Sequence, residues 1–101
     1  MQLVYDDVKR KTSMTLGTAI AKVYKDFDTI RIVDGVETRN WFKFFVTDAT
    51  GNLIGNSSTM AVNKKTGEVG WKYIMDPLFS NDEIIMIYDN EDIKKASDQH
   101  S

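Results

Sequence analysis

The chain of 101 residues contains no cysteine, one proline and one histidine. Without cysteine there is no disulfide, no thiol chemistry and no cysteine-ligated metal. The only imidazole belongs to His100, which lies in a polar stretch beside the last residue, so we predict no histidine-based acid–base catalysis. A domain of this composition must be stabilised by its hydrophobic core.

Long apolar runs and a positive net charge are also missing. No run approaches the roughly 20 apolar residues that cross a bilayer, and Asp6 and Asp7 interrupt the position of a signal-peptide core. We predict no membrane insertion by this chain and leave its compartment open, either cytoplasmic or exported. A formal charge of −2 gives no overall attraction to phosphate backbones, so no nucleic-acid partner is expected.

The chain is rich in apolar and aromatic side chains. Hydrophobic residues make up 42%, including two Trp, four Tyr and five Phe. A chain of this length is typical of a single domain, so we predict one domain over residues 1–101 with one core. Residues 1–12, of mixed charge and weak periodicity, are interpreted as an N-terminal arm.

A helix is predicted over residues 13–27. Its apolar side chains recur at three- and four-residue steps and would line one face, and Ser13 or Thr15 can cap its first N–H groups. The helix needs a broad apolar partner, and the strands that follow are the candidate. The apolar residues in this pattern are Leu16, Ile20, Val23, Tyr24 and Phe27.

Residues 29–88 predict an antiparallel meander of four or five strands, because side chains alternate with period two between glycine turns. The first strand is expected to end at Asp34–Gly35, and the branched run 84–88 favours a fifth strand over a helix. Residues 89–101 are interpreted as a polar tail that forms a frayed helical turn or is disordered. The strand residues assigned to the core are Ile30, Ile32, Phe42, Phe44, Val46, Met60, Val62, Trp71 and Tyr73.

The glycine turn over residues 48–52 carries three side chains with oxygen atoms that could bind a cation. Asp48, Thr50 and Asn52 alternate around one turn, but an EF-hand calcium loop requires glycine and glutamate where this chain has Leu53 and Thr59. We interpret this segment as a hairpin turn. The sequence predicts no metal site, no cofactor and no catalytic residue.

A binding surface is predicted on the sheet face opposite the core. Trp41, Lys43 and Phe45 share one parity of the second strand, and Lys72 and Ile74 share the corresponding parity of the fourth. Either a protein partner covers this face, or another part of the chain covers it, or it is simply exposed. Self-association through an edge strand is a further possibility.

The order of helix, strand and long hairpin, with the segment Val62-Asn63-Lys64-Lys65-Thr66-Gly67-Glu68-Val69, resembles PepSY-type and other cystatin-like modules of bacterial exported proteins. The resemblance covers about residues 15–75. It implies one helix across an antiparallel sheet and a small non-catalytic domain, often an inhibitor or regulator.

We therefore predict an α+β fold with a single helix on a four- or five-stranded antiparallel sheet, and a binding or inhibitory function without bond chemistry. Two alternatives stay open. One is a cone-shaped enzyme or ligand carrier of the nuclear-transport-factor type, and the other is a phage or mobile-element inhibitor of a host factor. A Trp41 side chain enclosed with the helix would exclude the proposed surface.

Overall fold

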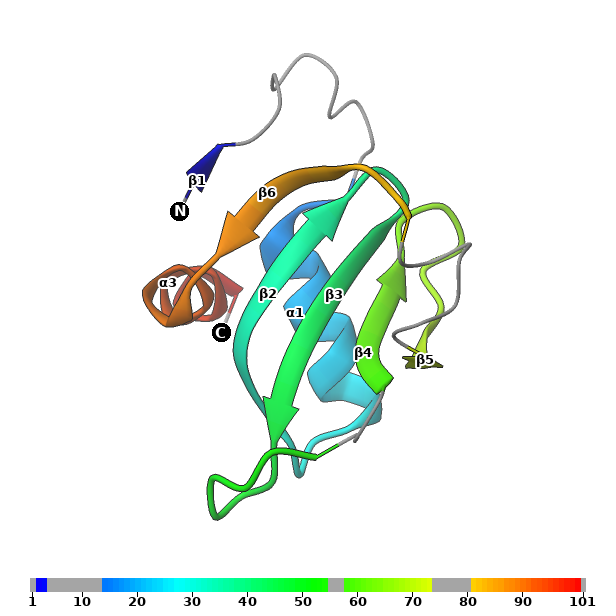
Figure 1. Ribbon diagram of the computed structural model, residues 1–101. Helices are drawn as coiled ribbons and strands as arrows, with labels where there is room; N and C mark the ends of the chain where they lie inside the picture. Colours follow the sequence, from blue (N-terminus) through cyan, green and yellow to red (C-terminus); the bar gives the residue numbers. More distant parts are fainter. Residues whose placement is uncertain (1, 4–13, 55–57, 74–80, 101) are drawn as a thin grey trace.

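The structure, a computed structural model, describes residues 2–3, 14–54, 58–73 and 81–100. They form an α+β fold in which one helix lies across a face of an antiparallel sheet (Figure 1), so the predicted fold class is confirmed. The elements are β1 (Gln2–Leu3), α1 (Leu16–Asp26), β2 (Arg31–Thr38), β3 (Trp41–Thr47), β4 (Ser58–Asn63), β5 (Val69–Tyr73), β6 (Ile84–Tyr88) and α3 (Asn90–His100).

Helix α1 (Leu16–Asp26) lies inside the predicted range of residues 13–27 and begins three residues after its predicted start. Thr15 is its N-cap, with its hydroxyl oxygen accepting a hydrogen bond from the N–H of Thr18 at 3.2 Å. The other candidate cap, Ser13, lies outside the described residues. Ile20 and Val23 are buried on the face that packs against the sheet, as the three- and four-residue spacing requires.

The strand order is β1-β6-β2-β3-β4-β5, with every neighbouring pair antiparallel. Strands β2 to β5 form the predicted meander. Strand β6 confirms the strand expected at residues 84–88, but it returns to lie beside β2, far from β5 (Figure 1). Strands β2 and β3 are therefore the central strands of the sheet.

The predicted end of the first strand at Asp34–Gly35 is wrong. Strand β2 continues to Thr38, and a register shift between Ile32 and Asp34 absorbs one extra residue as a bulge. Gly35 then lies under the ring of Phe44, where an added Cβ would be 2.7 Å from Cδ1 of that ring. The glycine that suggested a turn instead permits close packing within the strand.

The core lies between the sheet and the two helices. Most predicted core residues are buried or packed against the core, but Trp71 and Tyr73 are 40% and 57% exposed, which corrects their assignment to the core. Both have the predicted parity, yet they lie on the outermost strand β5, at the margin of the helical layer. The buried hydrophobic cluster is Ala19, Ile20, Val23, Ile30, Ile32, Phe42, Phe44, Val46, Met60, Val62, Ile85, Met86, Tyr88 and Ile93.

The structure also corrects the prediction of a polar tail over residues 89–101. Residues 90–100 form helix α3, in addition to the single helix predicted. Asp89 and Asp92 cap its start reciprocally. The N–H of Asp92 donates to Oδ1 of Asp89 at 2.9 Å, and the N–H of Asp89 donates to Oδ2 of Asp92 at 3.0 Å. Ile93 is 3% exposed and anchors α3 beside α1 and β2.

Candidate functional site

Strand β3 divides its aromatic side chains between the two faces of the sheet. Phe42 and Phe44 are fully buried on the side of α1. By the alternation of a strand, Trp41, Lys43 and Phe45 project from the opposite side. Neither α1 nor α3 lies on that side (Figure 1), and we call it the open face.

The register extends the open face over five strands. Lys43 of β3 lies opposite Val36 of β2 and Ala61 of β4. Val36 in turn lies opposite Ile87 of β6, and Ala61 lies opposite Gly70 of β5. The side chains at the centre of this row are small on the β4–β5 side and larger on the β6–β2 side, so the surface is uneven.

Four of the five predicted site residues are brought together on the open face. Trp41 and Lys43 are half-buried, Phe45 is 42% exposed, and Lys72 is exposed. The Nζ atom of Lys72 lies 5.2 Å from the centroid of a Trp41 ring, a cation–π distance. The fifth residue, Ile74, lies outside the described residues. Trp41 is not enclosed with α1, so the condition that would exclude this surface is not met.

Trp41 is held by a hydrogen-bonded clamp at the β2–β3 turn. The backbone N–H of Trp41 donates to the hydroxyl of Thr38 at 3.2 Å, and that hydroxyl donates to Oδ2 of Asp82 at 2.7 Å. Asp82 also accepts from the backbone N–H and the side-chain amide of Asn40, at 2.8 and 2.9 Å. The clamp ties the turn to the start of β6 and fixes the backbone from which the indole projects.

A hollow of about 140 Å³ lies beside Trp41, and we call it the Gly70 hollow. Ala61 and Gly70 form its floor, since they are register partners with the smallest side chains on this face. An added Cβ at Gly70 would meet no heavy atom within 4 Å, so the space above this residue is open. Sequence reasoning missed it, although a glycine at an open-face position of a strand was a usable signal. The lining is Trp41, Ala61, Glu68, Val69, Gly70, Trp71 and Lys72.

Two charged groups of the open face are partly withdrawn from water. Burial lowers the pKa of the Lys43 ammonium group, and the Asp82 carboxylate acts in the opposite direction. Burial raises the pKa of Asp34, which lies opposite Phe45 in the β2–β3 register. In both cases burial disfavours the ionised form, so an opposite charge brought by a ligand would interact strongly with these groups.

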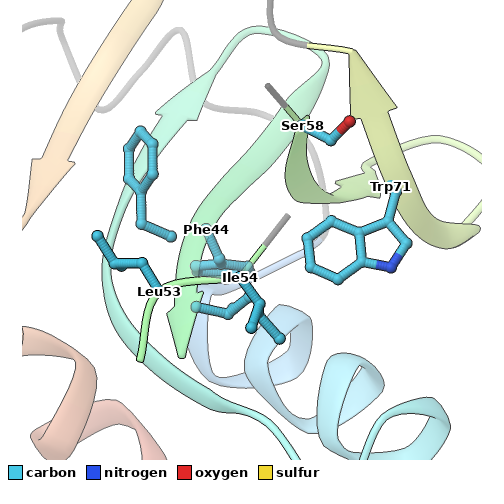
Figure 2. A pocket seen from close by; sticks show the side chains of 7 residues that line it. Phe44, Leu53, Ile54, Ser58 and Trp71 are labelled. Atoms are coloured by element: carbon cyan, nitrogen blue, oxygen red, sulfur yellow. The ribbon is translucent and has the colours of Figure 1, made fainter. Parts of the chain in front are cut away.

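A second cavity, of about 290 Å³, opens near the start of β4 (Figure 2). Trp71 faces Phe44 and Ile54 across it, and Leu53 lies near its rim. The seven lining residues provide one hydroxyl, that of Ser58, and no ionisable side chain. Its lining therefore suits apolar contact and supplies no acid–base pair. The lining is Phe44, Phe45, Val46, Leu53, Ile54, Ser58 and Trp71.

A buried polar cluster on the helix side of the sheet was not predicted. The hydroxyl of Tyr88 donates to Oε1 of Glu37 at 2.6 Å, and Nζ of Lys64 lies 2.5 Å from Oε2 of the same carboxylate. The side chains of Glu37 and Lys64 are 0% and 1% exposed, and Lys64 also lies 5.2 Å from the centroid of the Phe42 ring. Because solvent and ligands cannot reach it, the cluster joins β2, the β4–β5 turn and β6 as a structural element.

Comparison with known proteins gives no match to a protein family, to a curated sequence or to a solved structure. Within the described part of the chain, no group of three or more His, Asp or Glu side chains is placed to hold a metal. None of its helices has the length and apolar character required to cross a membrane. The open face and its hollow are the candidate binding site.

Proposed function

We propose that this protein is a non-catalytic binding or regulatory module that holds a protein partner on its open face. One observation carries the proposal. Trp41, Lys43, Phe45 and Lys72 gather on the face of the sheet that the described helices leave uncovered. Tryptophan and other aromatic side chains contribute disproportionately to protein interfaces, whereas an exposed face with no partner gains nothing from them.

The charge of the face suggests the chemistry of the partner. Lys43 and Lys72 place two ammonium groups on the open face, and Asp34 and Glu68 place two carboxylates there. A protein segment that places carboxylates against these lysines and an apolar side chain in the Gly70 hollow would match it. Attraction to Lys43 strengthens as the interface loses water, because this ammonium is already half-buried.

The mode of action would be occlusion or tethering of the partner. The hollow and the larger cavity have no constellation of acid, base and nucleophile among their lining residues, so the proposal assigns no bond chemistry to them. The resemblance to PepSY-type and cystatin-like modules agrees with an inhibitory or regulatory role.

One observation favours a second candidate, a carrier of a small apolar ligand. The 290 Å³ cavity is near the lower end of the roughly 300–1,000 Å³ that ligand pockets occupy, and its lining is aromatic and aliphatic. Saturable binding of a hydrophobic fluorescent probe that is lost in Trp71→Ala and kept in Trp41→Ala would support this candidate over the open face.

Site-specific photo-cross-linking in the organism of origin tests the main proposal. A benzophenone amino acid replaces Phe45 on the open face, and in a matched control it replaces Tyr73, which is also an exposed strand aromatic but has the opposite parity. We expect position 45 to give an adduct with a protein other than this chain, and we expect this adduct to be absent from position 73. The captured protein is then purified and its affinity for the unmodified chain measured.

If the proposal is correct, the affinity of the captured partner for this chain depends on the side chains of the open face. We expect Trp41→Ala/Phe45→Ala and Lys43→Glu each to weaken binding about tenfold or more, as for central interface residues. Lys95→Glu, at an exposed position of α3, should leave binding unchanged. Circular dichroism confirms that the variants are folded. Equal adducts from both positions, or unchanged affinity in the face variants, would remove the proposed surface.

A further inference from the structure

Strand β5 is the outermost strand on one side of the described sheet, beside β4. Its residues Trp71, Lys72 and Tyr73 are exposed. An edge strand presents a row of backbone N–H and C=O groups that can pair with a further strand. A strand added there would pair these groups and cover two large aromatic side chains.

The pairing with β4 shows which backbone groups point outward. The N–H of Asn63 donates to the C=O of Glu68 at 2.9 Å, so the backbone of Glu68 is directed toward β4. Since this direction alternates along an antiparallel strand, Gly70 and Lys72 are also directed toward β4. The N–H and C=O groups of Val69, Trp71 and Tyr73 are therefore directed away from the sheet.

The charges on this edge are self-complementary. Glu68 lies two residues before Gly70 and Lys72 lies two residues after it, so the three share one face of the strand. Within the described residues neither charged group forms an ion pair, and the contact shown for the Lys72 ammonium is the Trp41 ring. An antiparallel copy centred on Gly70 offers each charge its opposite.

We propose that β5 pairs antiparallel with β5 of a second copy of this chain, with the two Gly70 residues facing each other across a two-fold axis. In this register Trp71 and Val69 of the other copy exchange both backbone hydrogen bonds. Lys72 lies opposite Glu68 of the other copy at a non-hydrogen-bonded pair, where cross-strand side chains are closest. The neighbouring permitted register places Lys72 opposite Gly70 and loses both opposite-charge pairs.

The proposed pairing also brings the open faces of the two copies together. A two-fold axis perpendicular to a continuous sheet keeps the open faces of both copies on the same side, and the two Gly70 hollows meet at the axis. The dimer does not depend on the proposed partner, because Trp41 and Phe45 lie on β3, away from the pairing edge.

Disulfide trapping tests the register, and the absence of native cysteine makes each introduced thiol unique. In Gly70→Cys the two Cα atoms of the dimer would be about 4.5 Å apart, within reach of a disulfide. In the matched control Lys72→Cys they would be about 14 Å apart along the strands, which is too far. We expect the first variant to form a covalent dimer on mild oxidation and the second to form none. Equal cross-linking, or none in Gly70→Cys, overturns the register.

Sedimentation equilibrium of the full chain tests the association itself. We expect a reversible dimer of the unmodified chain, and about tenfold weaker association in Lys72→Glu and in Glu68→Lys, because each reversal places like charges opposite one another twice. The double variant Lys72→Glu/Glu68→Lys should restore the dimer, because opposite charges again lie opposite one another. A monomeric unmodified chain at its highest soluble concentration overturns the proposal. Trp41→Ala/Phe45→Ala should still dimerise, which separates this test from that of the partner face.

Discussion

Two glycines of the sheet have opposite surroundings, and this predicts opposite effects of alanine. An added Cβ at Gly35 would lie 2.7 Å from Cδ1 of buried Phe44 and 3.0 Å from the backbone oxygen of Lys43. We expect Gly35→Ala to lower the free energy of unfolding by about 1–3 kcal/mol, because ring and backbone must both move. Gly70→Ala meets open space and should be neutral or stabilise by up to about 1 kcal/mol. Urea unfolding of both variants measures the difference, and equal midpoints would refute the close packing at Gly35.

Two aspartates predict opposite dependences of stability on pH. Burial raises the pKa of Asp34 above 3.8, so folding disfavours its ionised form, and stability from this group rises as pH falls through the raised pKa. Hydrogen bonds from Thr50 and Asn52 lower the pKa of Asp48, so its contribution is present above 3.8 and is lost as pH falls through the lowered value.

We therefore expect Asp34→Asn to raise the melting temperature at neutral pH, whereas Asp48→Asn should lower it. Thermal unfolding from about pH 3 to pH 7 checks both signs, since each substitution removes one titrating group. If both variants shifted the melting temperature in the same direction at neutral pH, the direction of the pKa shift assigned to Asp34 or to Asp48 would be wrong.

At the scale of single residues, the alternation of side chains along a strand predicted the face of the sheet on which each residue lies, but not how deeply it is buried. Trp71 and Tyr73 have the parity of the core, yet their exposure follows from the place of β5 at the margin of the sheet. Parity is set by the local backbone, whereas burial depends on which elements cover a strand. The Gly70 hollow was missed because its lining comes from β3, β4 and β5 together, and the alternation within one strand does not show a space between strands.

At the scale of elements, strand β3 offers a direct test of its two faces. Phe44 is fully buried and its neighbour Phe45 is 42% exposed. We expect Phe44→Ala to cost about 3–5 kcal/mol of unfolding free energy, as for large core aromatics. Phe45→Ala, the matched control, should cost much less. Chemical denaturation of the two variants measures this, and similar costs would show that the faces were assigned wrongly.

The Glu37–Lys64–Tyr88 cluster ties three elements together through buried charge. Lys64→Met leaves the Glu37 carboxylate buried without its ammonium partner and should cost about 3–5 kcal/mol. Lys64→Met/Glu37→Leu removes both charges and should recover much of that loss. Denaturation of both single variants and the double variant completes the cycle. Additive costs would mean that the two charges do not interact in the folded protein.

The sequence predicted the elements that carry strong periodicity and missed one that does not. Helix α1 and strand β3 have regular apolar spacing, which local structure alone produces. Helix α3 has few apolar residues, and among its described side chains Ile93 is the one that enters the buried cluster, so its stability comes from packing beside α1. The reciprocal caps of Asp89 and Asp92 were the signal that could have found it.

At the scale of the whole molecule, topology decided what local patterns left open. The placement of β6 beside β2 brings Tyr88 to Glu37, which lies 51 positions earlier in the chain. The same placement leaves β5 at the edge of the sheet. Neither follows from the spacing of residues in one segment, because strand order is selected by packing of the complete domain. The open face, in contrast, followed from the alternation within β3 and β5.

Association of two folded chains through β5 predicts that thermal stability depends on protein concentration. Only the folded strand presents Glu68, Gly70 and Lys72 in the paired register, so a rise in concentration favours the folded dimer over unfolded chains. Above the dissociation constant, a tenfold rise should increase the melting temperature by about 3–5 °C for a domain of this size. Calorimetry over two decades of concentration measures the slope. Lys72→Glu or Glu68→Lys should flatten it, and the combined exchange should restore it. A melting temperature independent of concentration in the unmodified chain would mean that β5 remains a free edge.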